Sequence, residues 1–317
     1  MKMKHNCHTA CMGLMLLLCL AAGRGLARNV ADKNVCADTI TAFRFPAIPS
    51  TLTTPEARAA YLVEHYWDCT NWADSNYVHH PEVTEQAWVD YIDLMRLVPA
   101  QTADRSLKAL FGQAEKERKC YLYLRELAEK YLYDVGSPLR NEERYIAVLD
   151  ALLASDVLSE AEKIRPQAQR ELALRNRPGT VAVDFTYTLA SGEDGRLHDI
   201  RSDYVLLFVN DPGCHTCAET LDSLRHSSAV RRGIAASRLT VLSLYPDEEP
   251  DEWRQWLPDF PSTWINAYDR TLTIRERNLY DLRSLPVLYL LDSQKKVLLK
   301  NATVEEVEAV LEGQHER

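Results

Sequence analysis

A continuous apolar run, Tyr204–Val209, leads through a proline–glycine turn into two cysteines with the spacing C-x-x-C. An unbroken apolar run of this length predicts a central strand that is buried on both faces of a sheet. The cysteines, Cys214 and Cys217, stand at the start of a helix that we predict over residues 214–235. Unpaired N–H groups and the positive end of the helix dipole favour a thiolate at such a position. The segment therefore predicts a redox-active dithiol in an α/β domain.

Strand-like and helix-like segments alternate through the C-terminal part of the chain, residues 178–317. The expected strands are 181–185, Tyr204–Val209, Leu239–Tyr245, 263–266, Val287–Asp292 and Val297–Lys300. Helices are expected at 214–235, 251–256, 271–280 and Val304–Leu311, and a hairpin turn at Gly192 and Asp194-Gly195. Strands that alternate with helices and end in a hairpin and a helix predict an α/β sandwich with a mixed sheet.

Residues 51–175 show a different pattern, in which apolar residues recur at helical spacing. Helices are expected to begin at Thr54-Pro55-Glu56 and at Pro81, because proline suits the first helical position. Further helices are expected at 107–117, 120–133, Glu142–Ala154 and 159–176. The period changes at Asn176-Arg177-Pro178-Gly179, so we predict an all-helical domain of unknown function at 51–177, preceded by a linker at 28–50.

The first residues have the pattern of a signal peptide. Lys2 and Lys4 precede a short apolar run at 12–23, and Gly25-Leu26-Ala27 offers small residues to a signal peptidase. The run is well short of the roughly 20 residues that span a bilayer. We therefore expect residues 1–27 to be cleaved and the protein to be exported to the periplasm or cell envelope. A lipoprotein anchored through Cys19 is a less favoured alternative, because leucines rather than small residues precede this cysteine.

The charge of the chain argues against two classes of partner. Without Lys2, Lys4 and Arg24, the 37 basic residues fall to 34 against 46 acidic ones, so the mature chain would carry a net charge of −12. Nucleic acids and anionic membrane surfaces repel a chain of this charge.

Five cysteines remain after residue 27, namely Cys36, Cys69, Cys120, Cys214 and Cys217. The number is odd, so at least one thiol is free or pairs between molecules. Cys69 and Cys120 could form a bridge, which their spacing alone does not decide. Cys36 falls in the predicted linker.

About seventy residues after the dithiol, Ser284-Leu285-Pro286 precedes another apolar strand. With the strand–CxxC–helix segment, this proline makes the C-terminal domain resemble the thioredoxin superfamily, in its exported TlpA/ResA-like branch. The resemblance implies a thioredoxin-like fold, with a mixed central sheet flanked by helices and a cis bond before Pro286 that faces the dithiol. It also implies that Pro286, the backbone of Leu285 and Gly213 bind the substrate.

Three positions depart from the thioredoxin pattern. Gly213 stands where tryptophan is usual, and Phe208 stands where thioredoxins commonly bury an aspartate that relays a proton. Leu285 is bulkier than the usual threonine or valine. These changes concern the substrate-facing surface and the proton path rather than the fold. The carboxylates that could replace the missing base, each of which is more often a solvated charge, are Glu193, Asp194 and Glu219.

The resemblance implies an exported thiol–disulfide oxidoreductase, most simply a reductase of client proteins, meaning proteins whose disulfides it exchanges. Cys214 would attack the client disulfide, and Cys217, one helical turn later, would resolve the mixed disulfide. A protonated His215 would add a cation beside Cys214, and Asp211 would partly oppose it. No bound cofactor, metal or nucleic acid is expected. The electrons would come from an upstream dithiol protein, expected in the membrane.

Three segments of the helical half carry a second resemblance: Phe45-Pro46-Ala47-Ile48-Pro49, His65-Tyr66-Trp67-Asp68, and Tyr131-Leu132-Tyr133-Asp134 with Ser137-Pro138. They resemble an uncharacterised helical domain that precedes thioredoxin-like domains in envelope proteins of Bacteroidetes-type bacteria. This implies architecture and no chemistry, although the domain could select clients or dock the electron donor. His65, Trp67 and Asp68 are expected in core packing and capping, and His79-His80 in a surface turn.

Other interpretations of the dithiol remain open. Zinc normally needs four ligands, but the sequence has no second CxxC, and His198 and His226 are scattered. A purely structural disulfide is a further alternative, and a peroxidase would need an arginine and a threonine that the sequence does not assign. The main rival is an envelope binding or scaffold protein that keeps a thioredoxin fold without fast redox turnover. An accessible Cys214 favours the enzyme, and a buried or strongly bridged one favours the scaffold.

Overall fold

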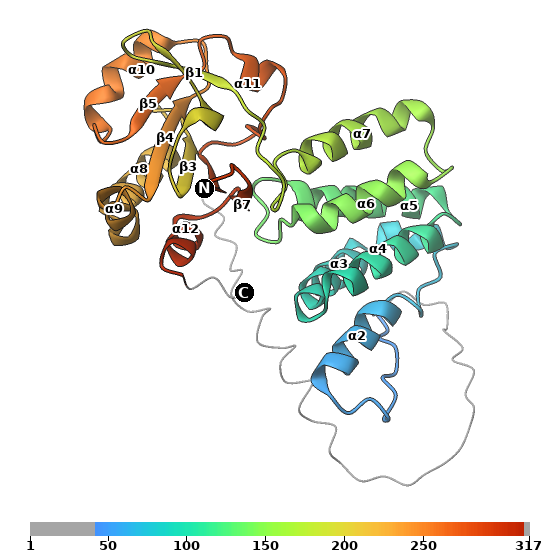
Figure 1. The fold of residues 1–317 in the computed structure, drawn as a ribbon. Coiled ribbons are helices and arrows are strands. Elements are labelled where there is room, and N and C mark those ends of the chain that lie inside the picture. The colour runs from blue at the N-terminus through green and yellow to red at the C-terminus, as the bar shows by residue number, and fades with distance from the viewer. Residues whose placement is uncertain (1–41, 314–317) are drawn as a thin grey trace, which may run out of the picture. The chain divides into compact units, whose positions relative to one another are not determined.

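The computed structural model describes residues 42–313 (Figure 1). The predicted signal peptide 1–27, the alternative lipidation site Cys19, Cys36, and residues 28–41 of the predicted linker lie outside the described residues. Helices fill residues 55–174, and a sheet with its helices follows at residues 186–311. Both regions belong to one compact unit of the chain.

The helices of the first region begin where local sequence rules place them. Thr54 caps the first helix by accepting from the backbone N–H of Ala57, and Asn141 caps another by accepting from that of Arg144. The predicted starts at Pro55, Pro81 and Glu142 are confirmed. The elements are α2 (Pro55–His65), η1 (Ser75–His79), α3 (Pro81–Leu94), η2 (Met95–Leu97), α4 (Ala100–Ala114), α5 (Arg118–Ala128), η3 (Glu129–Tyr133), α6 (Glu142–Ala154) and α7 (Glu160–Leu174).

Two predicted helices have different bounds. α4 begins at Ala100, directly after Pro99, and not at residue 107. The start of α4 is rich in polar residues, so a search for apolar periodicity misses it. Ser106 of this helix is nevertheless buried. Its hydroxyl is satisfied there, because it donates to Val63 O at 2.6 Å and lies 2.6 Å from Tyr91 Oη. The predicted helix 120–133 is α5 followed by the π-helical turn η3.

Aromatic residues form much of the core of the helical region, among them Tyr66, Trp67, Trp72, Trp88 and Tyr91. Trp67 lies 5.2 Å from Tyr66 and 5.3 Å from Trp72 between ring centroids, so it packs in the core as predicted. His65 Nδ1 lies within hydrogen-bond distance of Asp68 Oδ2, at 2.8 Å, and both side chains are exposed. The cluster at 65–68 therefore divides between core packing and the surface.

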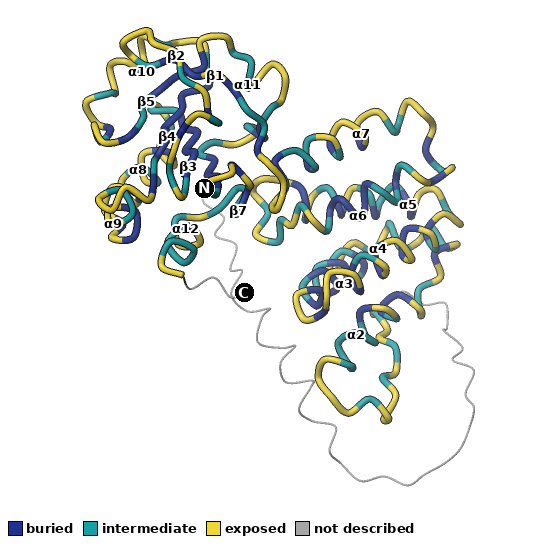
Figure 2. Tube along the Cα trace, viewed as in Figure 1, coloured by how far each residue is buried: buried dark blue, intermediate teal, exposed yellow. Residues whose placement is uncertain are grey.

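One mixed sheet runs through the second region, with the strand order β2-β1-β5-β4-β3-β6-β7. Its strands are β1 (Thr186–Leu189), β2 (Asp194–Arg196), β3 (Tyr204–Val209), β4 (Leu239–Tyr245), β5 (Ile265–Tyr268), β6 (Val287–Asp292) and β7 (Val297–Lys300). β3 is parallel to β4 and antiparallel to β6, and all of it after Tyr204 is buried (Figure 2). This confirms the predicted central strand and the mixed sheet.

Helices cover both faces of the sheet. They are α8 (His215–His226), α9 (Ser228–Ala235), α10 (Pro250–Trp256), α11 (Thr273–Glu276) and α12 (Val304–Leu311), with the short turns η4 (Leu197–Asp199) and η5 (Leu257–Asp259). Successive residues of β3 point to opposite faces. Leu207 shares a core cluster with Ile274 of α11, whereas Phe208 shares one with Leu224 of α8. The end of β3 therefore leads directly into the helix that covers one of these faces.

The start of the sheet differs from the prediction. Residues 181–185 are not a strand, because Val181 forms a single bridge to Lys296 and β1 begins at Thr186. The N–H of Val183 donates instead to the side chain of Asn176 at 2.7 Å. The turn predicted at Gly192 is confirmed by its positive φ of 88°, but Asp194-Gly195 lie in β2.

Three later elements also differ. The helix predicted at 214–235 is divided at Ser227, whose hydroxyl accepts from the N–H of Val230 and caps α9. β5 lies two residues later than the predicted strand 263–266. The helix predicted at 271–280 is only α11, which follows a left-handed residue, Leu272, at φ 55°.

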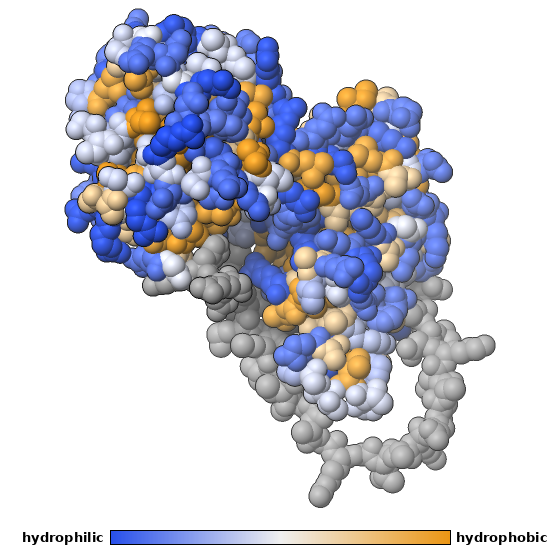
Figure 3. Space-filling model, viewed as in Figure 1, coloured by the Kyte–Doolittle hydropathy of each residue, from blue (hydrophilic) through white to orange (hydrophobic). Residues whose placement is uncertain are grey.

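The surface in Figure 3 is mostly hydrophilic, with smaller hydrophobic patches among the polar residues. Among the described residues, the exposed large hydrophobic side chains are Phe45, Leu97, Val135, Ile164, Val181 and Trp256. Within residues 42–313, no helix has the length and apolar character needed to cross a membrane.

Candidate functional site

The chain reaches the dithiol through a tight turn at the C-terminal end of β3. Asp211 accepts from Gly213 N through Oδ1 at 2.9 Å and from Cys214 N through its carbonyl oxygen at 3.1 Å. Aspartate in the first position and proline in the second are the residues that such a turn prefers. α8 begins directly after Cys214, which occupies its N-cap position. The sequence thus brings Cys214 to a helix N-terminus, as predicted.

The two cysteines have different environments. Cys217 has only 2% of its surface exposed, whereas Cys214 is partly exposed, and both are thiols. Burial is the main cause that raises the pKa of the Cys217 thiol to about 12. The N–H of Asp211, 3.5 Å from Cys217 Sγ, opposes this shift, and the charge of Asp211 adds to it. Cys217 is therefore protonated at neutral pH, and Cys214 is the sulfur that a disulfide from solvent can meet.

The residues just before β6 come close to the dithiol. The bond Leu285–Pro286 is cis, which confirms the prediction for this proline. The carbonyl oxygen of Leu285 lies 3.9 Å from Cys214 Sγ and can accept a weak hydrogen bond from its thiol. β6 begins directly after Pro286 and pairs Val287 with Val209 of β3. Adjacent strands therefore bring Leu285, the residue before the proline, to Cys214 from 71 residues away in the sequence.

His215 contributes less to the dithiol than its position in the sequence suggests. Its side chain is 88% exposed, and its Nε2 lies 3.4 Å from Glu219 Oε1. Water and the neighbouring carboxylate screen a charge at this place. We therefore expect only a small effect of His215 on Cys214.

Position 208 carries no carboxylate. Phe208, at the position of the usual buried aspartate, is buried and packs edge-on against Trp264 at 6.4 Å between ring centroids. The three carboxylates that the sequence offered as a replacement base are all exposed, namely Glu193, Asp194 and Glu219. Asp211 is the carboxylate whose charge acts on Cys217.

Acidic residues after β4 also reach the site, and the sequence analysis missed them. A Cβ atom added at Gly213 would lie 3.9 Å from Glu252 Oε1, so α10 packs beside this glycine. A hydrogen bond shared with the Glu249 carboxyl is the main cause that raises the pKa of Glu252, and the charge of Asp211 adds to it. The parallel strands β3 and β4 end at the same edge of the sheet, so residues that follow β4 lie near those that follow β3. The acidic run at 247–252, directly after β4, is therefore the sequence feature from which these carboxylates could have been predicted.

A pocket of about 210 Å³ opens beside Cys217. Its apolar walls come from Pro212, Leu221, Trp256 and Phe260. The exposed indole of Trp256 thus belongs to the surroundings of the dithiol rather than to an isolated surface position. An apolar side chain of a bound molecule fits such walls.

Residues 42–313 also bear on two alternatives that the sequence leaves open, a Cys69–Cys120 disulfide and a metal site. Cys120 is a buried thiol that donates to Asp74 O at 3.4 Å, so the bridge considered between Cys69 and Cys120 is not formed. Burial is the main cause that raises the pKa of Cys120 to about 11. In the same part of the chain, no group of three or more His, Cys, Asp or Glu side chains is placed to hold a metal ion.

Several solved structures are similar to this chain. A thioredoxin-like protein from Bacteroides caccae is 52% identical, covers 88% of this chain and 100% of its own, and has a TM-score of 0.84. The C-terminal domain of an uncharacterized protein from Bacteroides fragilis is 52% identical over 43% of this chain and 98% of its own, with a TM-score of 0.43. A thiol:disulfide interchange protein from Bacteroides sp. is 19% identical over 43% of this chain and 89% of its own, with a TM-score of 0.39.

A family described as a domain of unknown function, DUF5106, matches residues 25–176. The match ends two residues after α7, so it corresponds to the helical region. No curated protein matches the chain.

Proposed function

This chain belongs to the family of thioredoxin-like proteins, with a helical DUF5106 domain before its thioredoxin-like domain. We propose that it is an exported thiol–disulfide oxidoreductase that reduces client proteins. The observation that carries the proposal is the asymmetry of the dithiol. Cys214 is partly exposed at the N-terminus of α8, and Cys217 is buried one turn later. A disulfide exchanger needs one sulfur that a client can reach and a second that is protected until the mixed disulfide forms.

The same asymmetry favours the enzyme over a scaffold that kept only the fold. A scaffold has no use for an accessible cysteine beside a protected one, and a purely structural disulfide would join the two sulfurs permanently. Cys214 is partly exposed, so a client disulfide can reach it, whereas Cys217 is buried. The geometry therefore suits turnover.

The proposed reaction transfers two electrons to the client. The Cys214 thiolate attacks one sulfur of the client disulfide, so that a mixed disulfide forms and a client thiolate leaves. Cys217 then loses its proton and attacks Cys214 Sγ, which forms the Cys214–Cys217 disulfide and releases the second client thiol. An upstream dithiol protein, which we place in the membrane, reduces this disulfide again.

The surroundings of Cys214 suggest how the client binds. The carbonyl of Leu285 can accept from a client N–H, so an extended client segment would pair with the residues before β6. The cis-proline Pro286 leaves this side of the site without a competing N–H. Gly213 leaves room above the dithiol, and the pocket at Cys217 would take an apolar client side chain.

We further propose that the protein works in the periplasm or cell envelope after cleavage of residues 1–27. An oxidising compartment is where client disulfides form and where a reductase has substrates. The exchange needs no bound cofactor or metal, because the dithiol itself carries the electrons.

A Cys217→Ala variant should trap clients as mixed disulfides. Without Cys217 the bond between Cys214 and the client cannot be resolved from within the protein, so it accumulates. The reduced variant should be incubated with native insulin, whose disulfides are intact. Non-reducing gel electrophoresis and mass spectrometry should then show a covalent adduct at Cys214 that dithiothreitol removes.

The double variant Cys214→Ser/Cys217→Ala is the matched control and should form no adduct. Adduct formation through Cys69 or Cys120 instead of Cys214 would contradict the assignment of the nucleophile. The absence of an adduct in both variants would favour the scaffold.

A further inference from the structure

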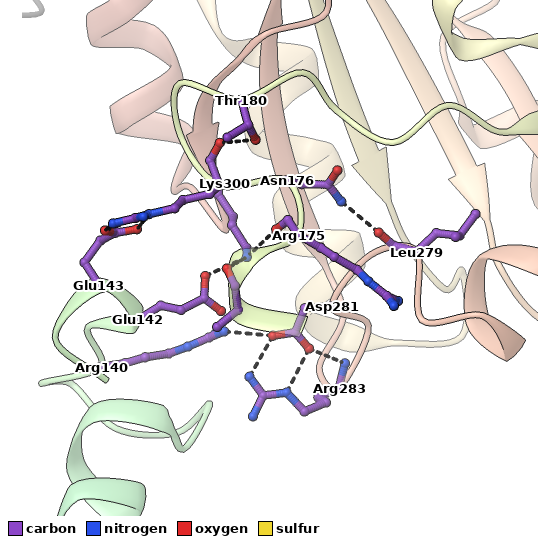
Figure 4. Close-up of polar contacts among 12 residues, drawn as sticks. Arg140, Glu142, Glu143, Arg175, Asn176, Thr180, Leu279, Asp281, Arg283 and Lys300 are labelled. Carbon is purple, nitrogen blue, oxygen red and sulfur yellow. Dashed lines mark hydrogen bonds and ion pairs between the residues drawn. The ribbon is translucent and has the colours of Figure 1, made fainter. Parts of the chain in front are cut away.

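The segment that leads to the cis-proline is held by the helical domain along its length (Figure 4). Arg175, directly after α7, donates from Nη1 to the carbonyl oxygens of Arg277 and Asn278 at 2.7 and 2.6 Å. Asn176 donates from Nδ2 to Leu279 O at 2.8 Å. Backbone acceptors in this segment are thus paired with side chains from a part of the chain about 100 residues earlier.

Asp281 is the polar centre of this contact. Its side chain is 2% exposed and accepts from Arg283 Nε at 2.8 Å and from Arg140 Nη2 of the helical domain at 3.2 Å. Burial alone would raise the pKa of this carboxyl, but the hydrogen bonds and charge of Arg283 and the charge of Arg140 lower it. Asp281 is therefore charged, and removal of Arg140 would leave a buried carboxylate with one arginine instead of two.

Arg283 makes a second contact with the helical domain. Its guanidinium carbon lies 3.6 Å from the centroid of the Tyr133 ring, well inside the range of an attractive cation–π contact. The Tyr133 ring stacks in turn on Tyr145 of α6, with centroids 4.6 Å apart. The hydroxyl of Tyr280, in the same segment, donates to Val183 O at 2.7 Å. The segment is thus bonded both to the helical domain and to the residues that lead into β1.

The next residues along the chain form one wall of the dithiol site. A single residue separates Arg283 from Leu285, whose carbonyl oxygen lies 3.9 Å from Cys214 Sγ. Pairing of β6 with β3 fixes the chain after Pro286. The contacts of Asp281 and Arg283 with the helical domain fix it before Leu285. The position of the Leu285 carbonyl therefore depends on both.

We propose that Arg140 and Tyr133 of the helical domain are positioning residues of the redox site. They hold Asp281 and Arg283, and through these residues the Leu285 carbonyl against which a client strand pairs. The inference rests on the proposed disulfide exchange and gives the helical domain a part in client recognition. A client that binds as an extended strand needs this carbonyl in place, whereas a small disulfide needs only access to Cys214.

Two substrates separate this role from a merely structural one. Steady-state reduction of insulin, a protein disulfide, and of hydroxyethyl disulfide, a small one, should be measured for wild type and for Arg140→Ala. We expect Arg140→Ala to raise KM for insulin about tenfold with kcat changed less than about twofold, because a displaced binding group weakens client binding. Its rate with hydroxyethyl disulfide should stay within about twofold of wild type.

Matched variants complete the experiment. Arg140→Lys keeps a charge beside Asp281 and should restore most of the insulin KM. Tyr133→Leu removes the ring under Arg283 and should reproduce the effect of Arg140→Ala. Arg144→Ala is the control, because Arg144 is also largely buried. Its observed side-chain contacts, with Asp104 at 2.7 Å and Ala100 O at 2.9 Å, lie within the helical domain. Its KM for insulin should equal that of wild type.

The outcomes are distinct. If Arg140→Ala loses activity equally with both substrates, or keeps the wild-type KM for insulin, the positioning role is wrong while the proposed function stands. If wild type reduces neither substrate, the proposed function fails and the inference fails with it. Hydrogen exchange gives a readout that does not depend on turnover: the amides of residues 279–285 should exchange faster in Arg140→Ala than in Arg144→Ala, and equal exchange would overturn the proposal.

Discussion

Replacing Cys214 with serine should abolish disulfide reduction, with a loss on the order of 10³-fold or more in the rate of insulin reduction. The serine hydroxyl is not ionised near neutral pH and forms no mixed disulfide, so the first step of the exchange cannot occur. Cys214 lies at the N-cap position of α8 and is not part of the buried core. The fold should therefore be unchanged, with a thermal midpoint within a few degrees of wild type.

Cys120→Ser is the matched control for this loss. Cys120 is buried in the helical domain, where its thiol donates to Asp74 O at 3.4 Å, a bond that a serine hydroxyl can replace. This variant should keep the wild-type rate. An active Cys214→Ser, or an equal loss in Cys120→Ser, would contradict the assignment of Cys214 as the nucleophile.

The second large effect concerns stability, at the contact between the helical domain and β7. Lys300 has a side chain that is 3% exposed, and its Nζ lies 2.6 Å from Glu142 Oε2. It also donates to the carbonyl oxygens of Ala173 and Arg175 at 3.0 and 2.8 Å, as Figure 4 shows in part. Lys300→Met should lower the free energy of unfolding by about 3–5 kcal/mol, because it leaves a buried carboxylate without its cation.

The loss in Lys300→Met should depend on pH in a defined direction. Burial raises the pKa of Glu142 above its ordinary value even though Lys300 opposes the shift. Since the folded pKa exceeds the unfolded one, the folded state gains stability as pH falls and the carboxyl takes up its proton. Without Lys300 the pKa rises further. The variant should therefore be most destabilised above the folded pKa of Glu142 and less so below it.

Urea unfolding of wild type and Lys300→Met at pH 8 and pH 5 measures both effects. Adding Glu142→Gln to Lys300→Met should recover part of the stability at pH 8, because it removes the unpaired charge. Lys108→Met is the control, since Lys108 pairs with Asp150 on the surface at 3.7 Å and should cost less than about 1 kcal/mol. An equally small loss in Lys300→Met would show that the buried pair is not important for stability. A loss that grows as pH falls would contradict the role given to the Glu142 carboxylate.

The sequence predicts those parts of the fold that have a local cause. β3, β4, β6 and β7 have the predicted bounds, because short runs of mostly apolar residues between turns favour strands. The same rule fails at 181–185, where the apolar pattern is present but the N–H of Val183 bonds to a side chain, Asn176, from the end of the helical region. The helical spacing of apolar residues likewise misses the start of α4, because the buried residues of this helix include the polar Ser106. Tertiary contacts decide both cases.

The residues of the candidate site also fall into two groups, those that the sequence predicts and those that only the tertiary structure reveals. Cys214 and Cys217 can be found from a short motif, because the turn and the helix N-terminus are local structures. The cis bond before Pro286 is predicted only by the resemblance to the thioredoxin superfamily. Glu252 comes to Gly213 only through the parallel pairing of β3 with β4. The contact of Arg140 with Asp281 joins residues 141 positions apart. Neither contact follows from spacing, so a single sequence does not predict them.

Measurement of the reduction potential of the Cys214–Cys217 pair is the direct test of whether the protein is a disulfide reductase. The protein should be equilibrated with glutathione buffers of graded potential, and the fraction of oxidised dithiol measured by alkylation and mass spectrometry, with Cys214→Ser as the control. We expect a two-electron transition that is absent from the control, with a midpoint near or below about −270 mV, the value of thioredoxin. A midpoint near −120 mV would contradict the reductase direction. A dithiol that does not equilibrate with glutathione would contradict the oxidoreductase itself.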